Sequence, residues 1–308
     1  MKSRMSRRSF LCQAAAAGTA LVAGKIVAGP LGRPFATGTP DIAAVTGTNY
    51  YDATVKAVEL LGGMQRFVSR GSRVGLLVNS VFDKPGSYVK PQIALAVITM
   101  CHEAGASQII SLEDAPRSYW RRAVLSNEHQ EYVKALVEPG PHKRVALPAG
   151  VFLKEVEVTG SLLECDAYIN VPIFKDHEGV RYTGSLKNIM GTTSSSSNRF
   201  FHGGSGIWGG YDDIQHLSQC IADANLLRKP TLCVGDATEV LIQNGPSGPG
   251  PVKAFHTVVA ATDPVAFDTY GVTLLGLRQD ELLTLRCAER HGLGTCDLGS
   301  LTIQKSSL

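Results

Sequence analysis

The sequence predicts an α/β fold with a mainly parallel sheet flanked by helices. Three successive segments lead to this expectation. Residues 73–79 (RVGLLVN) form a continuous apolar run, which is typical of a strand buried on both faces of a parallel sheet. A helix pattern follows over 91–104, with Pro91 in its first turn and Gly105 as its stop. Residues 108–113 then read as a second strand, and a strand–helix–strand unit is by default a right-handed crossover.

The rest of the chain continues this alternation. We expect strands at 43–46, 144–147, 153–158, 167–171, 231–235 and 257–261, and helices at 51–61, 127–137, 211–227, 264–275 and 279–290. The stretch 192–210 is rich in Ser, Gly and aromatic residues and is longer than a connector needs to be. It is predicted as a loop, either a mobile lid or a plain surface excursion.

Composition and charge narrow the classes of function. The chain has 308 residues, of which 44% are hydrophobic and 19% charged, so it can bury a large core and is neither fibrous nor disordered. The formal net charge is +3, but residues 1–40 hold six of the 30 basic residues and no acidic one. The remainder has 24 basic and 27 acidic residues, a net charge of −3, which excludes a broad basic surface for nucleic acid.

The amino-terminal segment has the features of an export signal. Adjacent Arg7 and Arg8 precede Ser9-Phe10-Leu11 and a moderately apolar, Ala-rich stretch, which resembles a twin-arginine signal peptide. We therefore expect residues 1–36 to be a signal peptide and 37–308 a single α/β domain. This predicts a periplasmic or extracytoplasmic protein, with the twin-arginine translocase as partner during export and no stable membrane insertion after cleavage. A general secretion signal and an uncleaved anchor are the alternatives.

The cysteines argue against an iron–sulfur cluster. Beyond the signal the chain has six, without a Cys-x-x-Cys or ferredoxin-like spacing: Cys101, Cys165, Cys220, Cys233, Cys287 and Cys296. Twin-arginine substrates cross the membrane folded, so obligatory disulfides are disfavoured and a cofactor inserted before export becomes more plausible. Most of these cysteines have apolar neighbours, and we expect small buried hydrophobic side chains.

The densest group of polar residues follows the predicted strand 167–171. Lys175 and His177 come first, and Thr183, Ser185, Lys187 and Asn188 then surround a predicted helix start. A helix amino end beside two lysines predicts an anion site, with Lys187 as a compact charge for a carboxylate or phosphate. His177 is a candidate general base or metal ligand. The alternative is a capped helix with solvated lysines.

Carboxylates at other strand ends could complete a metal site. Asp236 ends one predicted strand, Asp263 follows another, and Glu113 and Asp114 end a third. Together with His177, Asp236 and Asp263 would suit a divalent ion such as Zn, Mn, Fe or Ni. Asp263-Pro264 also has a structural explanation, because Asp caps helices well and Pro fits the first helical position.

Several of these motifs resemble the signature of domain-of-unknown-function family 362. The resemblance rests on Asn-x-Pro at 170–172, Lys-x-His at 175–177 and Thr-x-x-x-Lys-Asn-x-Met-Gly at 183–191. It extends to the strand ending at 77–79, to Gly235-Asp236-Ala237 with the glycines near 245–248, and to the Asp-Pro-Val-Ala block at 263–268. Val78 stands where the family often has Lys. Some members carry ferredoxin-type modules, but this chain lacks their cysteines, so the resemblance implies no cluster here.

These features together predict an exported enzyme that binds a small anionic substrate, with or without a divalent metal. Redox and isomerase chemistry both remain open, and a non-catalytic cofactor- or metal-binding maturation protein is the alternative. No NAD site is expected, because the G-x-G-x-x-G match at 204–209 follows no strand. The predicted catalytic residues are His177, Lys175 and Lys187; the predicted substrate-binding residues are Asn188, Thr183, Ser185 and Asn79; the predicted metal ligands are His177, Asp236 and Asp263.

Overall fold

A seven-stranded sheet runs through the centre of the protein. The computed structural model describes residues 38–113, 115–203 and 211–308, so the predicted signal peptide and Asp114 lie outside the described residues. The strand order is β11-β1-β10-β9-β6-β2-β3. The strands span Ile42–Thr46 (β1), Arg73–Val78 (β2), Gln108–Ser111 (β3), Ala167–Val171 (β6), Leu232–Leu241 (β9), Val252–Ala261 (β10) and Ile303–Ser307 (β11).

The predicted α/β fold with a mainly parallel sheet is confirmed. β3, β2, β6 and β9 form a continuous parallel set, and β1 is parallel to β11. β10 is the exception, because it runs antiparallel to both β9 and β1. The central strands of the parallel set are nearly continuous apolar runs, as expected where helices cover both faces.

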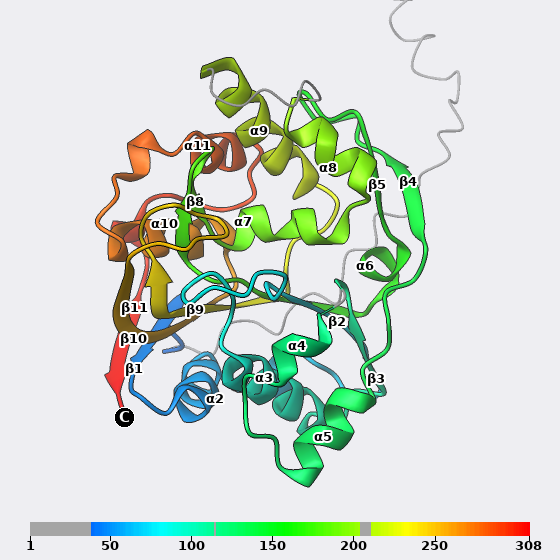
Figure 1. The fold of residues 1–308 in the computed structure, drawn as a ribbon, viewed down its shortest axis with the longest axis vertical. Coiled ribbons are helices and arrows are strands. Elements are labelled where there is room, and N and C mark those ends of the chain that lie inside the picture. Colours follow the sequence, from blue (N-terminus) through cyan, green and yellow to red (C-terminus); the bar gives the residue numbers. More distant parts are fainter. Residues whose placement is uncertain (1–37, 114, 204–210) are drawn as a thin grey trace, which may run out of the picture. The chain divides into compact units, whose positions relative to one another are not determined.

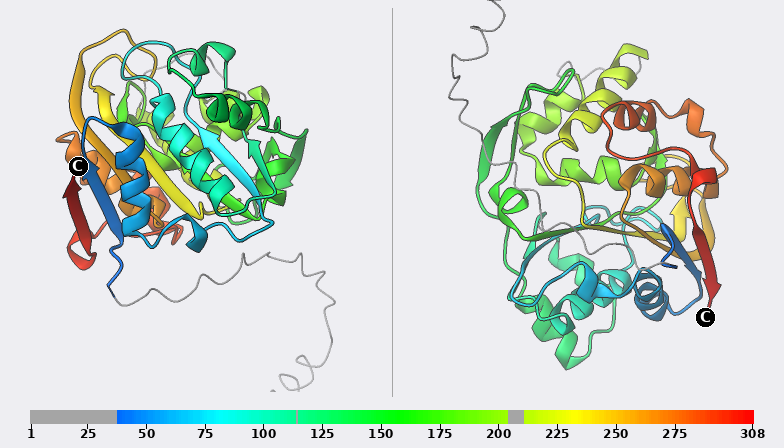
Figure 2. Two further views of the ribbon diagram at one scale, coloured as in Figure 1. Left: turned by 90° about the horizontal axis from the view of Figure 1, so that it is seen from below. Right: turned by 180° about the vertical axis from the view of Figure 1, so that it is seen from behind.

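Helices cover the sheet on both sides (Figures 1 and 2). One layer contains α2 (Tyr50–Leu60), α3 (Pro91–Glu103), α4 (Arg117–Trp120) and α5 (Asn127–Lys134). The opposite layer contains α7 (Ser185–Asn188), α8 (Ser195–Phe201), α9 (Tyr211–Ala224), α10 (Pro264–Leu274) and α11 (Leu283–Arg290). Each layer packs against its own sheet face through a separate apolar core, which gives a three-layer arrangement.

Two small hairpins lie outside the main sheet. β4 (His142–Ala146) pairs with β5 (Glu155–Thr159), and α6 (Gly160–Glu164) follows directly. β7 (Lys175–His177) pairs with β8 (Arg181–Thr183), immediately before α7. Short 3-10 turns occur at Met64–Arg66, Ile189–Thr192, Gln279–Glu281 and Leu298–Ser300. The second hairpin therefore presents the predicted Lys-x-His motif at the carboxyl end of β6.

The structure corrects the predicted loop over 192–210. Residues 195–201 form α8, and the Ser194 side chain caps it by accepting the backbone N–H of Ser197. The Ser- and Gly-rich composition and the length of the stretch predict a loop, but serine is also a favoured amino cap and begins a helix here. Residues 204–210, which hold the G-x-G-x-x-G match, lie outside the described residues. The sequence reading also missed β11, whose residues are mostly polar and partly exposed.

Candidate functional site

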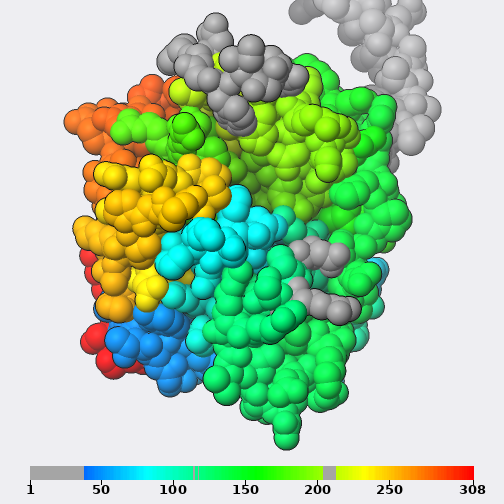
Figure 3. Space-filling view, in the orientation of Figure 1, coloured from blue at the N-terminus to red at the C-terminus, as the bar shows by residue number. Residues whose placement is uncertain are grey.

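Lys175 is buried beneath the segment that follows β2. Its residue is 0% exposed, and its Nζ donates to the backbone carbonyl of Ser87 at 2.5 Å. The same Nζ lies 3.4 Å from Asn79 Oδ1 and 4.5 Å from the centroid of the Phe82 ring. The covering segment (cyan in Figure 3) lies at the surface beside the turn after β9 (gold), where Gly86 accepts the Leu241 N–H. Lys175 is therefore a fixed, enclosed cation.

The surroundings of Lys175 lower the pKa of its side chain and so reduce the fraction of it that is charged. Burial lowers the pKa of its ammonium to about 7, and the nearby ammonium of Lys187 lowers it further, while Glu113 acts in the opposite direction. Near neutral pH the amine is therefore balanced between its charged and neutral forms. A bound anion would favour the charged form.

His177 is held in one tautomer by the turn of its own hairpin. Its Nδ1 accepts backbone N–H groups from Gly179 at 3.0 Å and Val180 at 3.3 Å. Burial, followed by the charge of Lys187, lowers the pKa of the imidazole to about 2. A neutral ring that accepts at Nδ1 carries its proton on Nε2, so His177 is an N–H donor. Action as a base or metal ligand would require these backbone bonds to break.

Lys187 has a different environment from Lys175. It lies on α7 and is partly exposed, and within the described chain its Nζ forms no hydrogen bond or ion pair. Burial lowers the pKa of its amine to about 8, and the carboxyl group of Glu113 opposes that shift. The ammonium group of Lys187 therefore has no hydrogen-bond or ion-pair partner among the described residues.

Glu113 supplies the acidic group beside both lysines. It lies just after β3 and is partly exposed. Burial raises the pKa of its carboxyl to about 7, although Lys187 and Lys175 act to lower it. The carboxylate rests against Gly191, where an added Cβ would lie 2.5 Å from Oε2. The glycine of the Met-Gly motif therefore makes room for the acid.

A chain of amide side chains connects Lys175 to α7. Asn79 Nδ2 donates to Asn188 Oδ1 at 3.0 Å, and Asn188 Nδ2 donates to Asn170 Oδ1 at 2.7 Å. Asn170 Nδ2 in turn donates to the backbone carbonyl and the Oγ of Ser185, at 2.9 and 3.0 Å. These side chains are mutually oriented, because each donor meets an acceptor of fixed position. Asn79, Asn188 and Ser185 therefore position the lysines through this network.

The amino end of α7 is already occupied by a protein carboxylate. Asp268 accepts the backbone N–H of Ser185 at 2.6 Å and that of Leu186 at 2.9 Å. Burial raises the pKa of this carboxyl to about 7, whereas the two backbone bonds lower it. The predicted use of this helix start as an anion site is thus not what the structure shows. Asp268 takes that place as a cap contributed by α10.

Thr183 lies on β8 next to these groups in the chain and is 2% exposed. Its Oγ1 has no hydrogen-bond partner among the described residues. It is the one predicted substrate-binding side chain in the described structure whose polar atom is buried and unsatisfied. The side chains of Asn79, Ser185 and Asn188 all form hydrogen bonds within the network described above.

The predicted metal ligands are engaged separately. Both oxygens of Asp236 accept hydrogen bonds, from the Lys90 backbone N–H and from Thr238. Asp263 caps α10 and also accepts the Thr295 N–H. It follows β10, whose carboxyl end pairs with the amino end of β9, whereas Asp236 lies within β9 and does not end it as predicted. His177 likewise accepts at Nδ1, so the three predicted ligands have separate protein partners, and no group of three His, Cys, Asp or Glu suited to a metal occurs among the described residues.

The cysteines lie apart from this chemistry. All six described cysteines are free thiols, and five are buried, as the apolar contexts predicted. Cys233 comes closest to the site, with its Sγ 3.1 Å from Ser185 Oγ. Burial raises the pKa of this thiol above its usual range, so it is a neutral hydrogen-bonding group.

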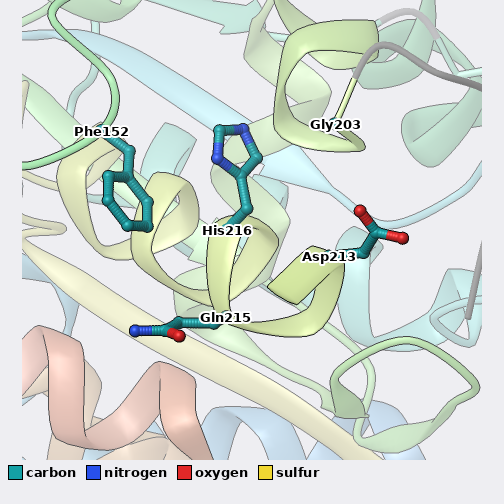
Figure 4. Close-up of a pocket in the computed structure, with 5 residues that line it drawn as sticks. All are labelled: Phe152, Gly203, Asp213, Gln215 and His216. Carbon is teal, nitrogen blue, oxygen red and sulfur yellow. The ribbon is translucent and has the colours of Figure 1, made fainter. Parts of the chain in front are cut away.

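A separate hollow of about 410 Å³ lies beside α9 (Figure 4). Phe152, Gly203, Asp213, Gln215 and His216 line it. The His216 ring stacks on Phe152 with centroids 5.4 Å apart, and Phe200 makes an edge-on contact with it at 5.2 Å between centroids. Its Nε2 lies 2.9 Å from the Phe200 carbonyl oxygen. The hollow is a surface feature with one constrained histidine and no lysine in its lining.

The site was partly predictable from the sequence. The structure brings Lys175, His177 and Lys187 into electrostatic range of one another, and Asn79 and Asn188 form hydrogen bonds beside them. Glu113 was recognised only as a carboxylate at a strand end, and Asn170 and Asp268 were not predicted as site residues. Asn170 is the first residue of the Asn-x-Pro motif, a signal that could have identified it.

Comparisons with known proteins found a similar sequence and a similar solved structure. The thylakoid-associated protein sll1697 of Synechocystis sp. is 26% identical over 243 residues, covering 77% of this chain and 73% of that protein. A Thermotoga maritima protein solved by structural genomics covers 80% of this chain, with a TM-score of 0.38 and 11% identity, and this chain spans 60% of its length. In the described ranges no helix is long and apolar enough to cross a membrane.

A family model extends these comparisons across the site. Residues 74–273 match the model for the domain of unknown function DUF362, an interval that contains Asn79, Glu113, Lys175, His177 and Lys187. The match covers well over half of the chain. The protein therefore belongs to the DUF362 family.

Proposed function

We propose that the protein is an enzyme that binds a small anionic substrate beside Lys187. The observation that carries the proposal is an excess of cationic groups. Among the described residues, Glu113 is the carboxyl group that affects both Lys175 and Lys187, and neither lysine forms an ion pair there. Buried charges normally have partners, and an ammonium without one favours binding of an anion.

Each side chain has a distinct role in this proposal. Lys187 contacts the anion, because it is partly exposed and not committed to another described group. Lys175 contributes mainly positive potential, since it is enclosed and bonded to Ser87. His177 offers its Nε2 proton as a neutral donor. Asn79 and Asn188 fix the position of Lys175 relative to α7 through their hydrogen bonds.

Glu113 gives the site a means of moving a proton. A carboxyl group with a pKa near 7 can donate or accept a proton at neutral pH, which is the condition for efficient general acid–base catalysis. The amine of Lys187, with a pKa of about 8, is matched to exchange protons with it. Proton transfer at a bound anion, as in an isomerase, is therefore the chemistry that we propose for the site.

Ligand screening by thermal unfolding tests the binding proposal. We expect sulfate, phosphate or small carboxylates to raise the midpoint of unfolding of the purified protein, since a ligand that binds only the folded state stabilises it. Lys187→Met should abolish the shift and Lys187→Arg should retain part of it. Lys134→Met, at an exposed lysine on α5, is the matched control and should behave like the wild type. Equal shifts in wild type and Lys187→Met would overturn the proposal.

The same variants separate an enzyme from a carrier. With a substrate found by the screen, Glu113→Gln should bind the ligand and lose turnover. A ligand that binds without turnover, in wild type and Glu113→Gln alike, would instead establish a non-catalytic binding or maturation protein. Metal analysis of protein purified without chelators tests the metal prediction, because a stoichiometric metal that is lost in His177→Ala would place it at this hairpin.

Export through the twin-arginine route is a separate part of the proposal. It rests on Arg7 and Arg8 before the apolar stretch of the leader, which lies outside the described residues. Replacing both arginines with lysine should retain the full-length chain in the cytoplasm, whereas the unaltered chain should be recovered outside it and shortened near residue 36. Unchanged localisation of the double variant would contradict this route.

A further inference from the structure

The segment that covers Lys175 forms a loop of its own, which we call the cover loop (residues 80–88). Its residues, all within the described part of the chain, contain no helix or strand. Its two ends are joined, because the Val89 backbone N–H donates to the Asn79 carbonyl oxygen at 2.9 Å. A compact surface loop whose ends lie together is an Ω-loop, and such loops are frequently functional. The cover loop lies at the surface of the protein (cyan in Figure 3).

Three hydrogen bonds join the cover loop to the rest of the described chain. Their donors are Lys175 Nζ, the Arg122 guanidinium and the Leu241 backbone N–H, and each acceptor is a backbone carbonyl oxygen of the loop. The bonds are 2.5, 3.1 and 3.2 Å long in that order. Arg122 Cζ also lies 4.0 Å from the centroid of the Tyr88 ring. Because these contacts are few, the loop can leave them without unfolding of the sheet.

Polar groups under the cover loop are incompletely satisfied. Ser80 is 0% exposed, and its Oγ has no hydrogen-bond partner among the described residues. The Tyr119 hydroxyl is also buried without a partner there, and the ring of Tyr119 meets that of Tyr88 edge-on with centroids 6.4 Å apart. Lys175 is enclosed without an ion pair in the described chain. Burial of such groups costs free energy of desolvation, which opening of the loop would recover.

We propose that the cover loop is a lid that opens as one unit about Asn79 and Val89 and exposes Lys175 to the solution. The hydrogen bond between these two residues stays intact while the loop turns away, so they form the hinge. Opening breaks the three hydrogen bonds described above and lets water reach Ser80 and Lys175. It would also give an anion direct access to Lys175; that consequence rests on the proposed function, whereas the opening itself does not.

Thiol labelling at two matched positions tests the lid. Ser218 on α9 is, like Ser80, a buried serine whose Oγ has no partner among the described residues. Ser80→Cys and Ser218→Cys are treated with excess maleimide at urea concentrations below the unfolding transition, and peptide mapping identifies the labelled thiol. We expect Ser80→Cys to label at least about tenfold faster, at a rate that changes little with urea, because local opening exposes little surface. Equal rates with the same steep urea dependence would overturn the proposal.

Removing one contact of the lid should speed its opening. Arg122→Gln, added to Ser80→Cys, removes the hydrogen bond to the loop and the contact with Tyr88, and should raise the labelling rate about threefold or more. Arg121→Gln, at the adjacent exposed arginine, is the matched control and should leave the rate unchanged. A labelling rate that Arg122→Gln does not alter would place the opening elsewhere and would also overturn the lid.

Hydrogen exchange detects the same opening without an introduced thiol. The Leu241 N–H donates to the loop, whereas the Asp236 N–H, on the same strand, donates to the Pro172 carbonyl oxygen at 2.9 Å. In Arg122→Gln we expect the protection of the Leu241 N–H to fall about threefold or more while that of Asp236 is unchanged, because a lid couples its contacts. Unchanged protection of Leu241 would overturn the proposal. None of these measurements includes an anion, so their outcome is independent of the proposed binding site.

Discussion

Asp268 on α10 holds the backbone N–H of Ser185 at 2.6 Å across 83 residues of sequence. α7 begins at Ser185 after Gly184, which has no side chain to cap it, and Asp268 supplies the missing acceptor for both Ser185 and Leu186. A Cβ at position 184 would lie 2.2 Å from Asp268 Oδ1, so the absent side chain is also what admits the carboxylate. The helix that carries Lys187 is therefore held in place by α10, its neighbour in the same layer.

Asp268→Asn should destabilise the protein by about 1–3 kcal/mol, because one of the two backbone N–H groups would face an amide donor and remain unsatisfied while buried. Urea unfolding monitored by circular dichroism measures the loss. Asp297→Asn is the matched control, since Asp297 caps an exposed turn through a single bond to Gly299 and should cost about 0.5 kcal/mol or less. Equal effects of the two substitutions would show that the Asp268 cap does not hold α7.

The connection from Lys175 to α7 gives a second prediction. Asn188→Leu removes the acceptor for Asn79 and the donor for Asn170, leaving one partly buried and one fully buried amide end unsatisfied. We expect a loss of about 2–4 kcal/mol in the free energy of unfolding, together with weaker sulfate binding because Asn79 no longer steadies Lys175. Asn127→Leu, at an exposed asparagine on α5, should change neither measurement. An unchanged free energy of unfolding in Asn188→Leu would show that this hydrogen-bond network does not stabilise the site.

The main features of this fold were predictable because buried strands and capped helices leave local patterns. Arg73–Val78 and Ala167–Val171 are apolar runs that became parallel neighbours, and Pro91 began its helix as expected. The direction of β10 was not predictable, since an apolar run carries no information about the orientation of its neighbours. Because β10 runs antiparallel, Asp263 follows a strand end that pairs with the amino end of β9, whereas Asp236 lies within β9.

The site was predictable to the extent that its residues are close in sequence. Lys175, His177 and Lys187 fall within thirteen residues, and a strand end followed by a helix start draws attention to them. The tautomer of His177 depends on two backbone N–H groups in the hairpin turn, and the acid beside Lys187 comes from β3. Contacts of this kind depend on tertiary folding, so residue types and spacing do not reveal them.

Anion affinity should depend on pH in a defined direction. Lys175 and Lys187, with pKa values of about 7 and 8, lose charge as the pH rises, and Glu113, with a pKa of about 7, gains negative charge. Sulfate keeps its charge throughout, so its affinity should fall at least tenfold between about pH 6 and pH 9. Isothermal titration calorimetry at constant ionic strength measures this fall.

Glu113→Gln isolates the acidic contribution to that profile. The variant should match the wild type near pH 6, where Glu113 is protonated, and bind sulfate more tightly than the wild type near pH 9, where the wild-type carboxylate repels the anion. A sulfate affinity that is independent of pH in both proteins would contradict the assignment of these three groups to the binding site.

The neutral state of His177 has a consequence for acid stability. Its pKa is about 2 in the folded protein and near 6.5 when unfolded, so between these values the unfolded chain binds more protons. The stability associated with His177 is therefore fully present above about pH 6.5 and is lost as the pH falls, by up to about 1.4 kcal/mol for each pH unit. In His177→Gln this loss should disappear, because glutamine does not titrate and its carbonyl can still accept a backbone N–H.

Urea unfolding of wild type and His177→Gln at pH 7.5, 6 and 5 tests this prediction through the difference between the two proteins, in which all other titrating groups cancel. The wild type should lose about 1–2 kcal/mol relative to the variant between the first pH and the last. If the difference between wild type and His177→Gln does not vary with pH, His177 is not held neutral by its hairpin. The Nε2 donor assigned to the anion site would then have to be replaced by a titrating imidazole, which would restore the base role predicted from the sequence.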